Sequence, residues 1–118
     1  MNRYKRTDRV STIIHRAVSE IIENDIRDTR KGMVTVTDVQ VAKDFKTAKI
    51  FVSVLGDSDQ VKKSVELLNN AAGFIRAKLG DMIIIRYVPS LKFYYDASTV
   101  TGMKMDSILK ELNTESIE

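Results

Sequence analysis

The sequence predicts an α+β fold in which helices pack on one face of a three-stranded sheet. Apolar residues repeat with helical spacing near the N-terminus and again in the middle of the chain. Between these two segments, apolar residues alternate as they do in paired strands, and a third β-rich run follows the second helical segment. Elements in this order form two layers around one hydrophobic core.

The composition suits one compact domain. The chain has 118 residues, of which 43% are hydrophobic and 30% charged, with a formal net charge of +3 and no cysteine. Disulfides and thiolate chemistry are therefore excluded. No apolar run approaches the roughly 20 residues of a membrane span, and the basic N-terminus leads into an amphipathic pattern instead of a signal peptide. We expect one domain over residues 1–112, a frayed tail over 113–118, no membrane association and a cytoplasmic location.

The first predicted helix has the strongest pattern in the sequence. Its apolar residues keep the i, i+3, i+4, i+7 spacing over four turns, and they are Val10, Ile13, Ile14, Ala17, Val18, Ile21, Ile22 and Ile26. Thr7 or Asp8 is a suitable N-cap. Basic residues gather at the N-terminal end, where the helix dipole favours acids. They are Arg3, Lys5, Arg6, Arg9 and Arg16. This distribution suggests an external anion, and the alternative is a solvated face with a flexible arm.

Two strands follow a turn cluster at residues 28–32. Apolar residues alternate over 33–41, but their phase changes near Thr37 or Asp38, which predicts a β-bulge, with one continuous strand that has twisted ends as the alternative. Alternation continues over 48–55. A short turn separates the two segments, so we expect them to form an antiparallel hairpin.

Residues 58–80 have helical spacing but contain two asparagines and a glycine in the middle. An interior glycine costs about 1 kcal/mol relative to alanine, so a bend or a close approach is expected at Gly73. We predict two helices joined at a tight kink. Its residues are Ala71, Ala72 and Gly73. Residues 56–59 are expected to end the strand and cap the first of these helices, and Gly80 to end the second at the C′ position.

The last part of the chain predicts a strand and a helix. Residues 82–88 are β-rich without clean alternation, which indicates a strand buried on both faces for part of its length. Pro89 ends this strand or places it at an edge, and residues 91–95 resume extended structure. From Ser98 onward, apolar spacing suggests a C-terminal helix that Gly102 weakens.

No residue pattern indicates catalysis. His15 is the only histidine, and it has no companion at the spacing of a metal site or a nucleophile–base pair. The acidic pairs Asp25/Asp28 and Asp57/Asp59 are explained by caps and turns. Phosphate-binding glycine motifs are missing from the sequence. We therefore expect no enzyme, no metal and no cofactor, with a hydrolase using His15 as the weakest alternative.

Aromatic and basic residues leave binding open. Phe93, Tyr94 and Tyr95 are adjacent, so on a strand at most part of this trio shares one surface, and core packing is favoured over a base-stacking platform. Arg76 and Lys78 follow the predicted kink, where small side chains and backbone amides permit a phosphate to approach. Close packing between two helices explains the small side chains equally well.

The order of elements matches a type II KH-like arrangement, in which two consecutive helices usually meet at a GXXG loop that clamps nucleic-acid backbone. This chain has Ala71-Ala72-Gly73 at that place. With this departure, the chain resembles the ribosome-binding factor A family over nearly its whole length. The segments that carry the resemblance are 28–32, 34–39, 73–76, 88–93, 95–98 and 102–105.

The resemblance implies a bacterial assembly factor that binds the free 30S subunit and its 16S rRNA late in maturation. It further implies support for processing of the 16S precursor at its 5′ end and for growth in the cold, and absence from translating 70S ribosomes. Catalysis and cofactors are not implied, and we expect a monomer. Because GXXG is missing, we expect structured rRNA to be bound through phosphates and shape.

The residues expected to bind RNA are the basic ones at the N-terminal end and around the kink. They are Arg3, Lys5, Arg6, Arg9, Arg16, Arg76, Lys78 and Arg86. Two other functions remain as alternatives. One is a general RNA-binding regulator, and the other is a protein-interaction adaptor that uses the open sheet face or the tail helix.

Overall fold

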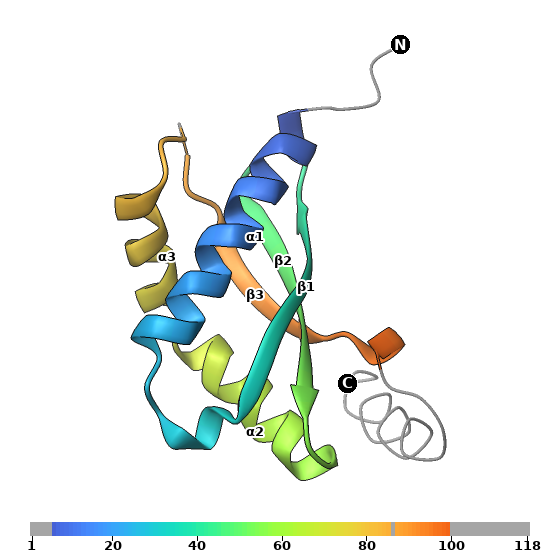
Figure 1. Ribbon diagram of the computed structural model, residues 1–118. Coiled ribbons are helices and arrows are strands. Elements are labelled where there is room, and N and C mark those ends of the chain that lie inside the picture. The colour runs from blue at the N-terminus through green and yellow to red at the C-terminus, as the bar shows by residue number, and fades with distance from the viewer. Residues whose placement is uncertain (1–5, 86, 100–118) are drawn as a thin grey trace.

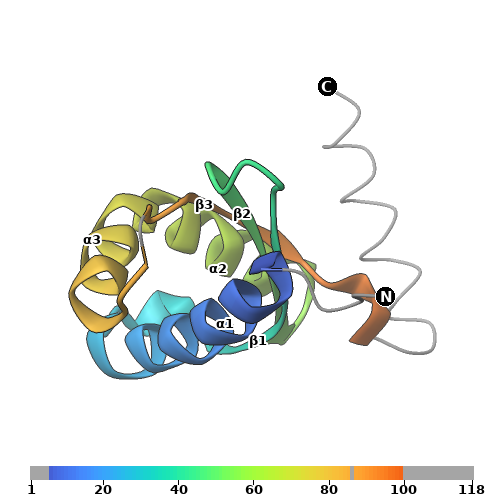
Figure 2. The ribbon, with the colours of Figure 1, turned by 90° about the horizontal axis from the view of Figure 1, so that it is seen from above.

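The computed structural model describes residues 6–85 and 87–99, and these form three α-helices, three strands and two short 3-10 helices. In chain order they are α1 (Arg6–Asp25), η1 (Thr29–Lys31), β1 (Met33–Val41), β2 (Thr47–Leu55), α2 (Ser58–Asn70), α3 (Ala72–Met82), β3 (Ser90–Tyr95) and η2 (Ala97–Thr99). The three helices lie on one side of the sheet (Figures 1 and 2). The α+β prediction is confirmed.

The sheet has the strand order β1-β2-β3. β1 and β2 form the predicted antiparallel hairpin, and the register shifts between Val36 and Asp38, which confirms the bulge. At the bulge, Thr37 Oγ1 lies 3.2 Å from Phe51 O and donates to Asp96 Oδ2 at 2.6 Å. β2 and β3 are parallel, so the chain needs a crossover between them, and α2 with α3 supplies it.

The hydrophobic core lies between the sheet and the three helices. Its most buried large side chains come from every layer, and they include Ile14, Val18, Ile21, Ile50, Val52, Leu68, Ile75, Leu79 and Phe93. His15 lies beside this core, with Nε2 3.1 Å from the Val36 carbonyl oxygen. This contact joins α1 to β1, so the histidine has a structural partner.

The turn at 28–32 is held against α2 by polar contacts. Ser64 is fully buried and its Oγ donates to the Lys31 carbonyl, while Gln60 Nε2 donates to the Arg30 carbonyl at 3.0 Å. Gly32 has a φ of 72°, and a Cβ there would lie 2.7 Å from Gln60 Nε2. The positive φ therefore favours glycine at this turn, and any larger residue would also displace the Gln60 side-chain amide from its bonds to Arg30 and Ser64.

The predicted helix ends are partly right. Asp57 is the N-cap of α2, as expected, and its Oδ1 accepts a bond from Gln60 N at 2.9 Å. The cap predicted for the first helix is wrong, because α1 already begins at Arg6 and includes Thr7 and Asp8 in its first turn. Gly80 does not end α3, which continues to Met82 because Leu79 O still accepts the amide of Ile83.

The strand predicted over 82–88 is also wrong. The described residues between α3 and β3 adopt no regular structure, and Ile84 is fully exposed. The reason is the parallel pairing: β3 enters the sheet beside the start of β2, where Ser90 pairs with Thr47 and Ser90 N donates to Lys46 O. The described residues between α3 and β3 lead to that edge, and β3 begins directly after Pro89.

The expected C-terminal helix and the 113–118 tail lie outside the described residues. Within the described ranges, no helix has the length and apolar character that crossing a membrane requires.

Candidate nucleic-acid interface

The joint between α2 and α3 is a one-residue break at Ala71, inside the predicted kink. Ala71 has φ −94° and ψ 5°, and its amide donates to Leu67 O at 3.0 Å and Leu68 O at 3.1 Å. Its own carbonyl accepts the amide of Ile75 at 2.9 Å. The backbone therefore changes direction while its hydrogen bonds on both sides are kept.

Gly73 does not cause this bend. It lies in the first turn of α3 and is exposed, and apart from its chain neighbours and the backbone of its own helix, no described atom lies within 4 Å of a Cβ built on it. Its φ is not in the left-handed region. Within the described chain, neither conformation nor packing requires glycine here, so this part of the joint is open to an external molecule.

Asn69 explains the other unusual residue of this segment. Its Nδ2 donates to Phe93 O at 3.0 Å, and its Oδ1 accepts the amide of Phe93 at 2.8 Å. β3 pairs with β2 on one side, so Asn69 satisfies the backbone of Phe93 on the outer edge of the strand. Sequence reasoning missed this role, and the only signal was an asparagine placed in a helix interior.

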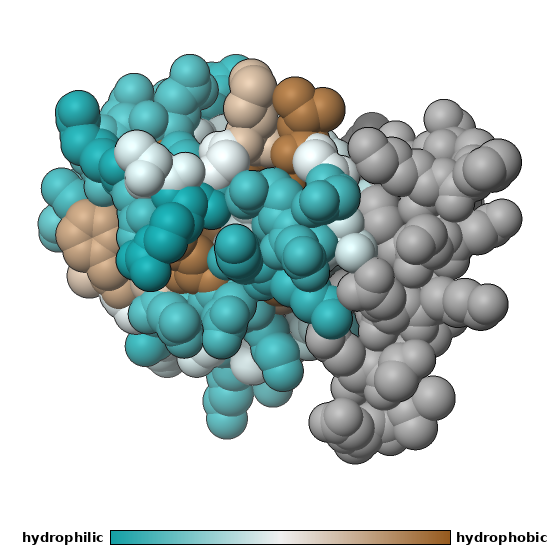
Figure 3. Space-filling model, turned by 90° about the horizontal axis from the view of Figure 1, so that it is seen from below, coloured by the Kyte–Doolittle hydropathy of each residue, from teal (hydrophilic) through white to brown (hydrophobic). Residues whose placement is uncertain are grey.

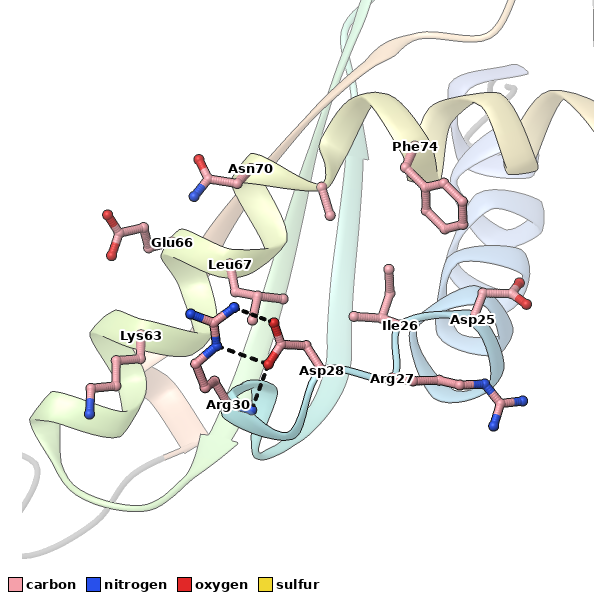
Figure 4. A pocket seen from close by; sticks show the side chains of 11 residues that line it. Asp25, Ile26, Arg27, Asp28, Arg30, Lys63, Glu66, Leu67, Asn70 and Phe74 are labelled. Atoms are coloured by element: carbon pink, nitrogen blue, oxygen red, sulfur yellow. Dashed lines mark hydrogen bonds and ion pairs between the residues drawn. The ribbon is translucent and has the colours of Figure 1, made fainter.

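A pocket of about 690 Å³ lies where the end of α1, η1, α2 and the joint meet (Figure 4). Its lining residues are Asp25, Ile26, Arg27, Asp28, Arg30, Lys63, Glu66, Leu67, Asn70, Ala71 and Phe74. Seen from below, the molecule presents a largely hydrophilic surface with hydrophobic side chains among the polar ones (Figure 3). Basic and acidic side chains are equal in number among the lining residues, so the pocket has no net charge to attract phosphate.

An ion pair in this pocket joins Arg30 to Asp28. Arg30 Nε donates to Asp28 Oδ1 at 3.0 Å, and Nη2 donates to Oδ2 at 2.5 Å. These side-chain bonds, followed by the bond from the Arg30 amide, lower the pKa of Asp28 to about 2. The guanidinium of Arg30 is thus already engaged by a carboxylate.

The two basic residues beyond the joint have different contacts. Arg76 Nε and Nη2 donate to the Val88 carbonyl at 3.1 and 2.8 Å, which ties α3 to the segment that leads into β3. Lys78 Nζ lies 5.8 Å from the centroid of the Phe74 ring. Arg76 remains exposed, and a guanidinium has five N–H donors, so its contact with Val88 leaves donors for a phosphate.

The basic residues of the N-terminal end are placed in part. Arg9 and Arg16 are exposed on α1, and Arg16 lines a groove of about 390 Å³ that Met82 and Ile83 border from the end of α3. Arg6 is the first residue of α1. Arg3, Lys5 and Arg86 lie outside the described residues.

The open face of the sheet holds four residues that the predicted site did not include. In the parallel register, Lys49 of β2 pairs with Lys92 of β3, and Phe51 pairs with Tyr94. The two rings stack with centroids 5.6 Å apart and an interplanar angle of 29°. Lys49 Nζ lies 5.9 Å and Lys92 Nζ 5.7 Å from the centroid of Tyr94.

The aromatic trio divides between the two faces, as the sequence predicts. Phe93 is buried in the core, and Tyr94 lies on the open face. Tyr95 points its hydroxyl into the protein, and burial, with Asp96 nearby, raises the pKa of that hydroxyl. Asp96 accepts bonds from Ser98 and Thr37, and these lower the pKa of its carboxyl.

Helices α2 and α3 crossing between parallel strands, preceded by a helix and a hairpin, define a type II KH-like domain without the GXXG loop. A family model described as ribosome-binding factor A matches residues 6–109. The chain belongs to the ribosome-binding factor A family.

A curated relative agrees with this assignment, and two solved structures share the fold. Ribosome-binding factor A of Azotobacter vinelandii is 39% identical over 115 residues, which cover 95% of this chain and 89% of the relative. The crystal structure of ribosome-binding factor A from Thermus thermophilus has a TM-score of 0.69 at 23% identity and covers 78% and 97% of the two chains. A homology model of the Thermus thermophilus protein, fitted into a cryo-EM map of a 30S–RbfA complex, has a TM-score of 0.63 at 22% identity and covers 76% and 94%.

Proposed function

We propose that this protein is a non-enzymatic assembly factor that binds the free 30S subunit through its 16S rRNA late in maturation. Membership of the ribosome-binding factor A family over residues 6–109 carries the proposal. The similar Thermus thermophilus protein in a 30S complex supports it. In this proposal the protein acts as a monomer in the cytoplasm, supports processing of the 16S precursor at its 5′ end and growth in the cold, and is absent from translating 70S ribosomes.

The contacts we propose are with phosphates. Arg9 and Arg16 present exposed guanidinium groups along α1, and Arg76 and Lys78 present charge along α3. Arg3, Lys5, Arg6 and Arg86 would extend these two groups. Because Gly73 has no side chain and is exposed, an RNA backbone could approach the joint at the place where other KH-like domains use GXXG.

Co-sedimentation with purified 30S subunits tests the phosphate contacts. Neutralising several phosphates makes affinity fall steeply with salt, so the bound fraction should decrease strongly between about 50 and 200 mM salt. A bound fraction that does not respond to salt would contradict phosphate contacts.

Charge reversal on α1 tests whether Arg9 and Arg16 contribute to 30S binding. The double substitution Arg9→Glu and Arg16→Glu should weaken 30S binding by tenfold or more, because it removes two cations and adds two anions. Lys63→Glu is the matched control, since Lys63 lies in the charge-balanced pocket and its reversal should change binding little. Arg76 is unsuitable for the first test, because it also holds Val88.

The same assay separates the proposal from a general RNA-binding regulator, which would bind short RNAs as tightly as it binds 30S subunits. Sedimentation of a cell lysate adds a second criterion. The protein should travel with free 30S subunits, and its presence in 70S fractions would count against the proposal.

A further inference from the structure

The open face of the sheet carries a compact arrangement of two lysines and two aromatic rings, which we call the open-face platform. It consists of Lys49, Phe51, Lys92 and Tyr94, all on β2 and β3. The lysines form one row across the two strands and the rings form the next row. The three α-helices pack on the other face, so none of them covers this platform (Figure 2).

Folding alone does not favour this arrangement. Lys49 and Lys92 are exposed and lie directly opposite each other, and like charges in such a position destabilise a sheet. Their contacts with the Tyr94 ring offset part of this repulsion, because an aromatic face attracts a cation. An anion bound between the two ammonium groups would remove the remainder.

The charged residues on the open face are also distributed unevenly, in a way that favours an anion. Two acids lie near the rings: Asp38 of β1 pairs with Phe51, and Asp96 directly follows β3, where its carboxylate accepts bonds from Thr37 and Ser98. The lysine row lies one row farther along β2 and β3 from both acids. A polyanion is therefore attracted to the lysine row, and its path would run from there to the ring row.

We propose that the open-face platform binds an unpaired stretch of RNA, with a base stacked on Tyr94 and its flanking phosphates on Lys49 and Lys92. Aromatic rings on a sheet surface bind single strands in this way, and stacking is tolerant of sequence because every base has a π-face. A duplex buries its base faces, so it cannot use the rings. This inference rests on the proposed function for the source of the RNA, and it adds a second contact beside the phosphate contacts of α1 and α3.

The experiment measures the affinity of the full chain for a fluorescein-labelled ten-nucleotide uridine strand and for an RNA duplex of equal length, by fluorescence anisotropy. Tyr94→Leu removes the ring and keeps an apolar side chain, and Tyr94→Phe is the matched control that keeps the ring. We expect Tyr94→Leu to weaken binding of the single strand about tenfold, and Tyr94→Phe to stay within about twofold of the natural chain.

The lysines are tested by salt dependence. Replacing both Lys49 and Lys92 with glutamine removes two phosphate contacts, so the slope of log affinity against log salt for the single strand should decrease by about 1.4. Thermal unfolding of each variant checks whether the fold is kept, which we expect because none of the four side chains belongs to the buried core.

Three results would overturn the proposed platform: no binding of the single strand, equal binding by Tyr94→Leu and the natural chain, or a Tyr94→Leu variant that loses as much affinity for the duplex as for the single strand. Co-sedimentation with 30S subunits is measured on the same samples. If 30S binding persists while the single strand is not bound, only the proposal for the open-face platform is refuted. If the single strand binds through Tyr94 while the natural chain does not bind 30S subunits, the proposal for the platform is supported and the proposed function is refuted.

Discussion

The two faces of the sheet come from the same three strands but have different chemistry. The face under the helices is aliphatic and aromatic, with Ile50, Val52 and Phe93 almost completely buried. The other face alternates with it along each strand and presents Lys49, Phe51 and Tyr94. Burial accounts for the first set of residues. It does not account for the second, so the open face is where residue choice points to binding more than to folding.

The largest decrease in stability should come from a substitution on the face of the sheet that the helices cover. Phe93→Ala leaves a cavity in the core and should lower the free energy of unfolding by about 3–5 kcal/mol, as measured by urea denaturation. Tyr94→Ala changes the next residue on the opposite face and is the matched control. It should cost about 1 kcal/mol or less, and equal losses for the two variants would contradict the distinction between the faces.

A smaller effect should follow at the outer edge of β3. Asn69→Leu removes both bonds to the Phe93 backbone and leaves its N–H and C=O unpaired, so the free energy of unfolding should fall by about 1–3 kcal/mol. Asn70→Leu, one residue along and exposed, should change stability by less than about 0.5 kcal/mol. The same denaturation assay decides between these outcomes.

A substitution at the joint should increase the stability of the protein. Gly73→Ala should raise the free energy of unfolding by about 0.5–1 kcal/mol, because the site has room for a methyl group and alanine is the better helix former. If RNA approaches this surface, the same variant should bind 30S subunits more weakly. Gly80→Ala is the control: it also lies within α3, and its methyl group would meet Val88 at an ordinary distance. Equal 30S affinity of the two variants would mean that RNA does not contact the surface at Gly73.

The smallest effect on stability should come from the open face. Lys92→Gln should change the free energy of unfolding by less than about 0.5 kcal/mol, because relief of the repulsion from Lys49 and loss of the contact with Tyr94 oppose each other. Calorimetry measures this change. A loss above about 1 kcal/mol would mean that Lys92 serves the fold, and the contrast between the faces would then weaken.

Local patterns predicted most of the secondary structure. The helical spacing of α1, the alternation in the hairpin and the phase change at Thr37 each depend on neighbours in sequence, and all three are confirmed. The break between α2 and α3 was also predicted within the correct three residues. Its predicted cause was wrong, because Gly73 lies inside α3 and a Cβ there would contact nothing outside its own helix and chain neighbours. The strand predicted over 82–88 failed because β-rich composition does not show where a strand finds a partner.

The candidate site depended on contacts that composition does not reveal. Arg76 and Lys78 were predicted from charge beside a joint, but the bond from Arg76 to Val88 depends on how the chain returns from α3 to the sheet. The RNA-binding role of all eight predicted basic residues remains a prediction. Alternation in β2 already placed Lys49 and Phe51 on one face, but nothing in the sequence set them beside Lys92 and Tyr94.

Local sequence patterns are sufficient for the kinds of elements, their order, the bulge and the lack of a GXXG loop, because periodicity and residue type act over a few positions. The tertiary structure decided the start of β3, the pairing of Asn69 with Phe93 and the rows of lysines and rings. The physical reason is the crossover: the register of two parallel strands is set by the packing of α2 and α3 between them, and no local pattern records it.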